Sequence, residues 1–213
     1  MREQIKAFKR SRIIETASKL FFERGYEATS VESLATELGV TKPFIYSYFQ
    51  NKRAILEAVH QQAAERIVSY IDQATSAGHA SDEALSEFIR LFVFENIRNQ
   101  VASGVFLQEE KHLSDNTLNT VRSLEREVNK KLTALIQEGI DQGLFHITDA
   151  RIASMGISGM VRWVHRWYQR GGRHAPETIA QQMADLGLNM VRFNHPPVPR
   201  VPADNLADDG EHQ

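Results

Sequence analysis

The chain has 213 residues, no cysteine and a formal net charge of −2. Because cysteine is absent, disulfide scaffolds, thiolate metal sites and cysteine nucleophiles are excluded. The longest stretches without Asp, Glu, Lys or Arg are ten residues long, 99–108 and 152–161, whereas a membrane-spanning helix needs about 20 apolar residues. The basic start is followed by no apolar run, so a secretory signal is not expected. These features predict a cytoplasmic protein that does not enter a membrane.

Charge is distributed unevenly along the chain. Residues 1–60 contain ten Lys or Arg and seven Asp or Glu, whereas residues 61–213 contain fifteen and twenty. A basic N-terminal segment followed by an acidic remainder favours contact with a polyanion at one end of the molecule. An ordinary solvated helix start is the alternative explanation.

Helical periodicity begins near the N-terminus, and strand signals are almost absent from the whole chain. Apolar residues between positions 13 and 21 lie on one helix face, and Gly25 follows as a stop signal. A capping box formed by Thr29 and Glu32 predicts a short second helix that ends at Gly39.

The third predicted helix is short and has two unlike sides. Thr41 can cap it, its first turn tolerates a proline, and it ends near Phe49. At about 100° per residue, Ile45 and Phe49 face the core. The outward side then carries a lysine, a proline, two aromatic rings and a serine: Lys42, Pro43, Phe44, Tyr46 and Ser47. Exposed aromatic rings beside a lysine indicate a surface that binds a partner. DNA is such a partner, because its major groove admits a helix. Core packing is the alternative for Tyr46.

Further helices are predicted along the rest of the chain, and no internal repeat is found. Their expected ranges are 52–77, 81–100, 101–112, 115–142, 149–170 and 176–193. Four of the six prolines fall in residues 194–213, which are acidic and expected to be disordered. The predicted fold class is all-α.

Between residues 12 and 59 the chain carries an ungapped series of motifs: Ala17, Phe21, Gly25-Tyr26-Glu27-Ala28-Thr29-Ser30-Val31, Leu34-Ala35 and Leu38-Gly39-Val40-Thr41-Lys42-Pro43-Phe44-Ile45-Tyr46-Ser47-Tyr48-Phe49-Gln50-Asn51-Lys52. With these motifs, the segment resembles the DNA-binding domain of TetR-type transcriptional regulators. The resemblance implies a three-helix helix-turn-helix domain over residues 1–50. It also implies a larger antiparallel helical domain for effector binding and dimerisation over residues 51–193.

The resemblance implies contacts with double-stranded operator DNA. Thr41 and Lys42 would start the recognition helix. Phosphates would be bound by Tyr46, by Lys52 behind an Asn51 cap, and by Thr29. Base edges would face Pro43, Phe44, Ser47 and Tyr48.

Phe44 departs from the small or hydroxylated residue that the family often has at this position. We therefore expect sequence choice to depend on thymine methyl packing against Phe44 and Tyr48, and on DNA shape. The basic stripe Arg2, Lys6 and Lys9 would add attraction for the DNA backbone.

The last two predicted helices are the expected dimer surface. One carries small residues and the other an apolar stripe, and in the family such helices form a four-helix bundle with those of a second copy. The residues are Gly156, Gly159, Met160, Ile179, Met183, Leu186 and Met190. Packing within one chain is the alternative.

A chamber for a small-molecule effector is a further implication of the resemblance. Plain core packing is the alternative for its candidate walls, which are Phe88, Phe92, Phe106, Leu124, Val128 and Leu132. The segment with Arg162, Trp163, Arg166 and Trp167 resembles a TetR subgroup whose effectors are acyl-CoA thioesters. Guanidinium groups bind phosphates and indoles stack on planar rings, although an amphipathic interface helix would also explain this segment.

The sequence therefore predicts a ligand-responsive repressor that binds a palindromic operator as a homodimer and is released by an effector, with no cofactor and no metal. An enzyme is the first alternative, but the eight histidines show no His-Glu-x-x-His spacing, and no phosphate loop or Gly-x-Ser-x-Gly motif is present. A helical scaffold is the second, and it leaves Lys42, Tyr46 and Lys52 without a purpose.

Overall fold

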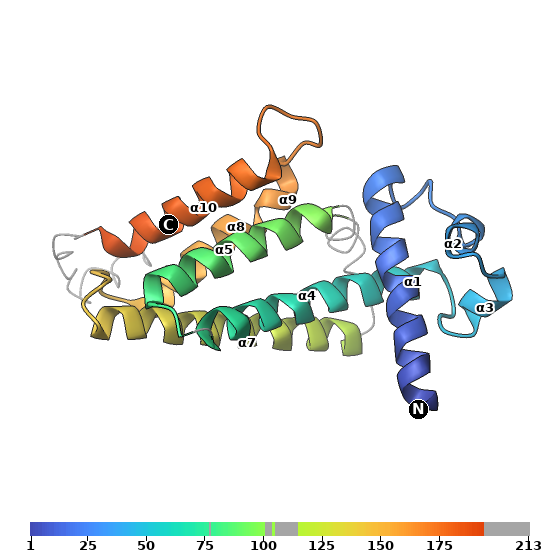
Figure 1. Cartoon of the computed structure of the whole chain (residues 1–213), viewed down its shortest axis with the longest axis horizontal. Helices are drawn as coiled ribbons and strands as arrows, with labels where there is room; N and C mark the ends of the chain where they lie inside the picture. The colour runs from blue at the N-terminus through green and yellow to red at the C-terminus, as the bar shows by residue number, and fades with distance from the viewer. Residues whose placement is uncertain (77, 101–103, 105–114, 194–213) are drawn as a thin grey trace, which may run out of the picture.

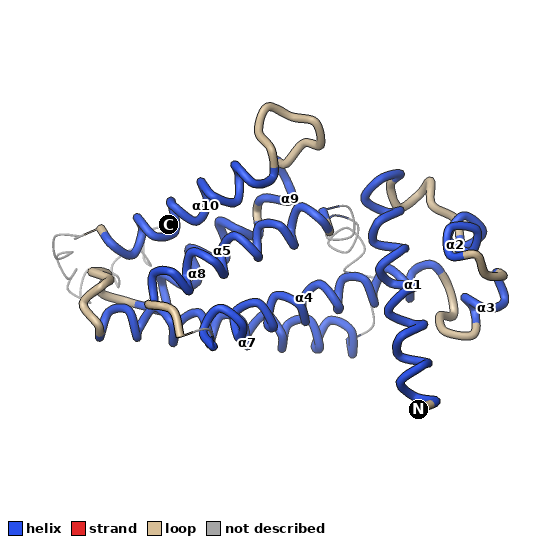
Figure 2. Tube along the Cα trace, in the orientation of Figure 1, coloured by secondary structure: helices blue, strands red, loops and turns tan. Residues whose placement is uncertain are grey.

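The computed structural model describes residues 1–76, 78–100, 104 and 115–193. Every regular element in these ranges is a helix, and none of them is a strand (Figure 2). The predicted all-α class is confirmed. Within the same ranges, no helix is both long and apolar enough to cross a lipid bilayer. The helix predicted at 101–112 and the tail at 194–213 lie outside the described residues.

The first unit consists of α1 (Arg2–Arg24), α2 (Val31–Leu38) and α3 (Lys42–Tyr46). Gly25 ends α1 with φ +88°, and Gly39 ends α2 in the left-handed region with φ +65°. Both conformations favour glycine because residues with a side chain are strained at positive φ. Figure 1 shows α2 and α3 on one flank of α1, and the N-terminal half of α1 extends beyond the rest of the molecule.

The start of α2 differs from the predicted capping box. Ser30, not Thr29, is the N-cap residue. Its side chain accepts from the backbone amide of Ser33, and its own backbone amide donates to the Ser33 hydroxyl. Glu32 instead forms an ion pair with Lys42 on α3. The prediction named the wrong pair because the chain reaches α2 one residue later than the Thr-x-x-Glu spacing indicates.

The first core extends past the predicted domain limit at residue 50. Helix α4 (Lys52–Ser76) begins after α3, and its Ile55, Leu56 and Val59 are buried in the same cluster as the apolar face of α1. We therefore propose that the N-terminal unit continues to Val59, and that α4 carries the chain from the first core into the second.

The second unit surrounds α5 (Ser81–Arg98), which is buried on most sides. Helix α4 and α7 (Asp115–Asp141) run along one side of it, and α8 (Ala150–Arg162) and α10 (Pro176–Arg192) cover the other (Figure 1). Phe88 and Phe92 of α5 have no exposed surface, as expected for the central helix of a bundle.

The helix predicted over 149–170 is interrupted. It consists of α8 and the single turn α9 (Val164–Trp167), separated at Trp163. The carbonyl oxygen of Arg162 lies 2.6 Å from Nδ1 of His165. The amide of Arg166 donates instead to Trp163, 2.9 Å away. A ring hydrogen bond to the backbone therefore competes with helix continuation at this point.

Candidate DNA-binding surface and inner pocket

The two predicted sides of α3 are present. Ile45 is fully buried and Phe49 is 5% exposed, so both belong to the first core. Tyr46 is 44% exposed, and Lys42 and Ser47 are exposed beside it. The core-packing alternative for Tyr46 is wrong, and α3 presents a phenol, an ammonium group and a hydroxyl to solvent.

Phe44 and Tyr48 form an aromatic pair at the edge of this surface. Their ring centroids lie 5.2 Å apart, and both side chains are half-buried. The Lys9 ammonium lies 5.7 Å from the Phe44 centroid, which is a cation–π distance. The basic N-terminal half of α1 and the aromatic edge of α3 are therefore parts of one continuous surface.

Lys42 has an acidic partner on α2. Its ammonium group pairs with the Glu32 carboxylate. This hydrogen bond raises the pKa of Lys42 and lowers the pKa of Glu32. Both side chains are exposed, so solvent screens the pair, and a DNA phosphate could compete with Glu32 for the ammonium group.

Lys52 is placed at the first turn of α4. Its Nζ donates to the backbone carbonyl of Tyr26 at 3.0 Å and lies 4.2 Å from the Tyr26 ring centroid. The predicted Asn51 cap is confirmed, because its Oδ1 accepts from the amide of Ala54 at 2.9 Å. An ammonium group has three donors, so Lys52 could bind a phosphate while it keeps the carbonyl.

Thr29 is turned away from this surface. It is 1% exposed, and its hydroxyl donates toward the backbone carbonyls of Gly25, at 2.8 Å, and Leu20, at 3.3 Å. The side chain therefore holds the turn between α1 and α2. The predicted phosphate contact by Thr29 does not fit this placement.

An inner pocket of about 50 Å³ lies between α4, α5, α7 and α8. Of the predicted effector residues, Phe92, Leu124, Val128 and Arg162 line it. Arg162 pairs with Glu125 of α7 on its wall. Its volume is below the roughly 300 Å³ of ordinary small-molecule sites. A larger ligand would have to move the walls.

The other predicted effector residues that the structure describes do not line this pocket. Phe88 and Leu132 lie in the second core, and Phe106 is outside the described residues. Trp163 and Trp167 are 60% and 46% exposed, and Arg166 stacks on Trp163 at 5.6 Å from the ring centroid. The break at residue 163 ends the predicted Arg/Trp stripe, and its indoles face outward.

Sequence patterns did not point to four polar residues that line the pocket: His60, Glu95, Asn96 and Asn99. Burial and the neighbouring Arg162 and His165 lower the pKa of His60 to about 4. Glu95 is 3% exposed. The sequence signal that could have indicated them is a carboxylate and two amides, Glu95, Asn96 and Asn99, at the end of an otherwise apolar helix.

The predicted dimer residues divide into covered and exposed groups. Ile179 and Met183 are each 7% exposed and pack in the core of their own chain, and Met160 and Met190 lie against that core. Leu186 is 54% exposed, and Gly156 and Gly159 are exposed on α8. Two exposed apolar residues of α8 that the prediction omitted, Ile152 and Met155, lie on the same helix.

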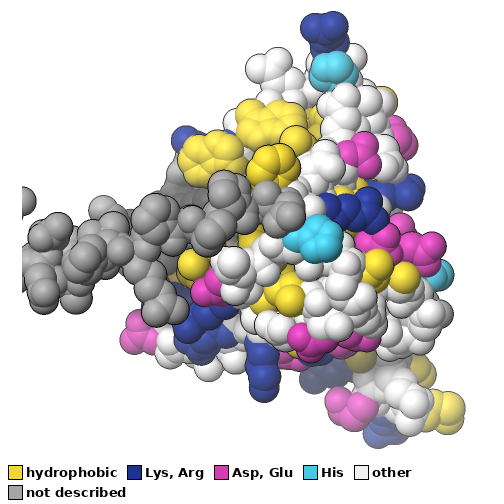
Figure 3. All heavy atoms as spheres, turned by 90° about the vertical axis from the view of Figure 1, so that its left-hand side faces the viewer, with side chains coloured by type: hydrophobic (Ala, Val, Ile, Leu, Met, Phe, Trp, Pro, Cys, Tyr) yellow, Lys and Arg dark blue, Asp and Glu magenta, His cyan; other side chains and the backbone are white. Residues whose placement is uncertain are grey.

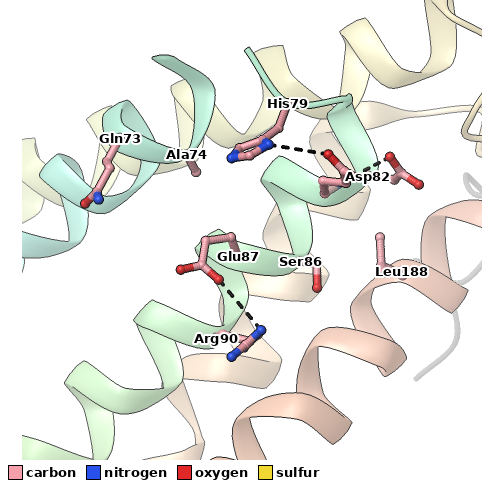
Figure 4. A pocket seen from close by; sticks show the side chains of 9 residues that line it. Gln73, Ala74, His79, Asp82, Ser86, Glu87, Arg90 and Leu188 are labelled. Carbon is pink, nitrogen blue, oxygen red and sulfur yellow. Dashed lines mark hydrogen bonds and ion pairs between the residues drawn. The ribbon is translucent and has the colours of Figure 1, made fainter. Parts of the chain in front are cut away.

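A more open groove lies at the far end of the bundle, between α4, α5 and α10 (Figure 4). Its charged side chains pair with one another. His79 lies 3.4 Å from Glu83, and Arg90 lies 3.9 Å from Glu87. Figure 3 shows this end of the molecule, where basic and acidic side chains are intermingled. Among the described residues that line the groove, acidic side chains outnumber the single arginine, which does not favour a polyanion.

The residues of α1–α4 thus form a helix-turn-helix unit with an exposed recognition helix, joined to a helical bundle with an internal pocket. These features define a two-domain transcriptional regulator. Residues 13–59 match the family model for bacterial regulatory proteins of the tetR family, and residues 78–191 match the Tetracyclin repressor-like C-terminal domain. The chain belongs to the TetR family, whose members are DNA-binding transcription factors and not enzymes.

Relatives agree with this assignment over most of the chain. The transcriptional repressor KstR2 of Mycolicibacterium smegmatis is 30% identical over 195 residues, covering 87% of this chain and 91% of the relative. PfmR of Thermus thermophilus is 32% identical with a TM-score of 0.69, covering 84% of this chain and 97% of that one. AibR, solved with isovaleryl coenzyme A and operator DNA, shares the fold at 24% identity, TM-score 0.63, and 86% and 97% coverage. The class is that of ligand-responsive repressors, so the enzyme and scaffold alternatives are set aside.

Proposed function

We propose that the chain represses transcription in the cytoplasm by binding a palindromic operator as a homodimer. The observation that carries this proposal is the outward side of α3, where Lys42, Tyr46 and Ser47 are exposed beside the basic start of α1. One recognition helix covers a half-site. A symmetric pair must therefore place two helices about 34–36 Å apart to enter successive major grooves.

Contacts with the duplex divide into two groups. We assign phosphate binding to Lys42, Tyr46 and Lys52, and to Thr41 through the start of the helix it caps. Base-edge contacts fall to Pro43, Phe44, Ser47 and Tyr48. The Ser47 hydroxyl donates to the carbonyl of Phe44 at 2.6 Å, so its oxygen would act toward a base edge as an acceptor. Packing of thymine methyl groups against Phe44 would carry much of the specificity.

The test measures binding to DNA from upstream of the protein's own coding sequence, by fluorescence anisotropy at several salt concentrations. Lys42→Ala with Tyr46→Phe should weaken binding about tenfold and reduce the salt slope by about one to two phosphate contacts. Lys19→Ala is the matched control, since it breaks a similar exposed pair, with Glu37, in the same unit. Equal affinity of the double variant and the control would contradict the proposed surface.

The effector in this proposal is an acyl-CoA thioester. Its support is Arg162, which lines the inner pocket and can bind a phosphate, together with the isovaleryl coenzyme A in the AibR complex. Isovaleryl-CoA and palmitoyl-CoA should raise the operator Kd by about fivefold or more, whereas free coenzyme A should not. If neither thioester changes the Kd, the effector class is wrong and the assignment as a regulator stands.

A further inference from the structure

One side-chain hydrogen bond joins the N-terminal unit to the bundle beside the inner pocket. The hydroxyl of Ser18, on α1, donates to Oδ1 of Asn99 at 2.9 Å, across 81 positions of sequence. Ser18 is 4% exposed and Asn99 is 2% exposed. Buried polar groups are costly unless they are paired, so each side chain depends on the other for its place.

The other end of the Asn99 amide is fixed by Glu95. Nδ2 of Asn99 donates to Oε1 of Glu95 at 2.6 Å and to the Glu95 carbonyl at 3.1 Å. An ionised carboxylate only accepts hydrogen bonds, so the nitrogen of Asn99 must face Glu95 and its oxygen must face Ser18. Moving the carboxylate would therefore disturb the bond to α1.

Glu95 itself is anchored to α4. Nε of Arg66 lies 2.8 Å from Oε1 of Glu95, and the Tyr70 hydroxyl donates to Oε2 at 2.9 Å. Burial raises the pKa of Tyr70, and the neighbouring carboxylate raises it further. A buried charge held by several donors has few alternative positions, so this cluster has a defined resting geometry.

The end of α5 is held on its opposite side as well. The next residue, Gln100, donates from Nε2 to the carbonyls of His165, at 2.8 Å, and Tyr168, at 2.7 Å. Glu95 and Asn99 both line the inner pocket. A ligand group that enters the pocket therefore contacts Glu95 and Asn99. Asn99 is in turn hydrogen-bonded to Ser18 of α1.

We propose that Asn99, oriented by Glu95, is a positioning residue that transmits occupancy of the inner pocket to α1. The apolar face of α1 packs in one core with Ile45 of α3, so a displaced α1 moves the recognition helix. This inference rests on the proposed function, because it assumes that pocket occupancy and operator binding are coupled. Its test needs no knowledge of the natural effector.

The experiment fills the pocket with a side chain. Ala64 is half-buried and lines the pocket, so Ala64→Leu acts as a tethered occupant. In the full-length protein with Ser18 intact, we expect it to change the operator Kd by about fivefold or more. When Ser18→Ala is present in both proteins, with Ala64 and with Ala64→Leu, their operator Kd values should differ by no more than about twofold.

A matched control separates this route from general loosening of α1. Ser11 is also on α1 and accepts a hydrogen bond from Gln62 of α4 at 3.2 Å. Gln62 does not line the pocket, and its Oε1 accepts from Arg66 at 2.9 Å, so this bond reaches the cluster at Arg66 and not at Asn99. Ser11→Ala should keep the full response to Ala64→Leu. Thermal melting checks that each variant is folded, and Ala64→Val replaces Ala64→Leu if the larger side chain prevents folding.

Hydrogen exchange of the α1 amides gives a second readout without DNA. Ala64→Leu should change exchange in α1 when Ser18 is present and leave it unchanged with Ser18→Ala. The inference is overturned if filling the pocket affects neither operator binding nor exchange, or if Ser18→Ala leaves the response intact. Failure of the proposed function would give a different result. The protein would then bind no operator, but hydrogen exchange would still show whether filling the pocket affects α1 through Ser18.

Discussion

His60 shows how the inner pocket affects a single side chain. The residue lies on α4, where burial and the neighbouring Arg162 and His165 favour its neutral form and lower its pKa from 6.5 to about 4. In the unfolded chain the imidazole takes up a proton near its ordinary pKa. Between these two values the unfolded state binds more protons than the folded state, so stability falls as the pH falls.

The expected loss attributable to His60 between pH 7 and pH 5 is about 2 kcal/mol of unfolding free energy. Urea unfolding at several pH values measures it, and His60→Gln should remove this part of the pH dependence. His174→Gln, at an exposed position, is the control and should leave the dependence as it is. The same pH dependence with and without His60 would show that the pocket does not shift this group.

At the scale of the element, helix α2 shows how one position decides a boundary. Ser30 begins the helix and accepts from the amide of Ser33 at 3.0 Å, while Thr29 is drawn inward by carbonyls at the end of α1. Two residues with hydroxyl groups were available, and the packing of α1 selected the second as cap. The same comparison explains why Glu32 is free to pair with Lys42.

Ser30→Ala should therefore cost about 1 kcal/mol of unfolding free energy, the usual value for a lost N-cap. Glu32→Ala should cost clearly less than Ser30→Ala, because it removes only an exposed ion pair that solvent screens. Both values come from urea unfolding monitored by circular dichroism. A larger loss of unfolding free energy for Glu32→Ala than for Ser30→Ala would instead support the predicted capping box of Thr29 and Glu32.

At the scale of the whole molecule, a row of exposed apolar residues remains on the bundle. Ile152, Met155 and Trp163 of the α8 side are 58–67% exposed, and Leu186 of α10 is 54% exposed. Exposed apolar groups of this size on neighbouring helices are typical of an interface. We propose that this face, and not the buried Ile179 and Met183, forms the dimer contact.

Met155→Glu with Leu186→Glu should convert the dimer to a monomer, since two charges per chain would be buried without partners. Analytical ultracentrifugation at micromolar concentration measures the result. Gln181→Glu adds a charge to another exposed position of α10 and should leave the dimer intact. A dimer that survives the double substitution would place the interface elsewhere.

The candidate DNA surface could be predicted from the sequence to a large extent because its signals are local. The spacing of Ile45 and Phe49 set the inward side of α3, and the remaining positions, among them Tyr46, were left outside. The inner pocket could not be predicted in the same way. Four of its residues were named, Phe92, Leu124, Val128 and Arg162. Trp163, named with them, is instead 60% exposed at the point where α8 ends.

By itself, the sequence determined the order of the helices, their stop signals at Gly25 and Gly39, and the two-sided character of α3, because periodicity and capping act over a few residues. Only the tertiary structure decided which polar side chains are buried and what they bind. Ser18 and Asn99 are 81 positions apart, and Glu95 meets Arg66 only where α4 and α5 pack together. Such pairings depend on helix packing, which brings distant positions into contact and has no signature in local spacing.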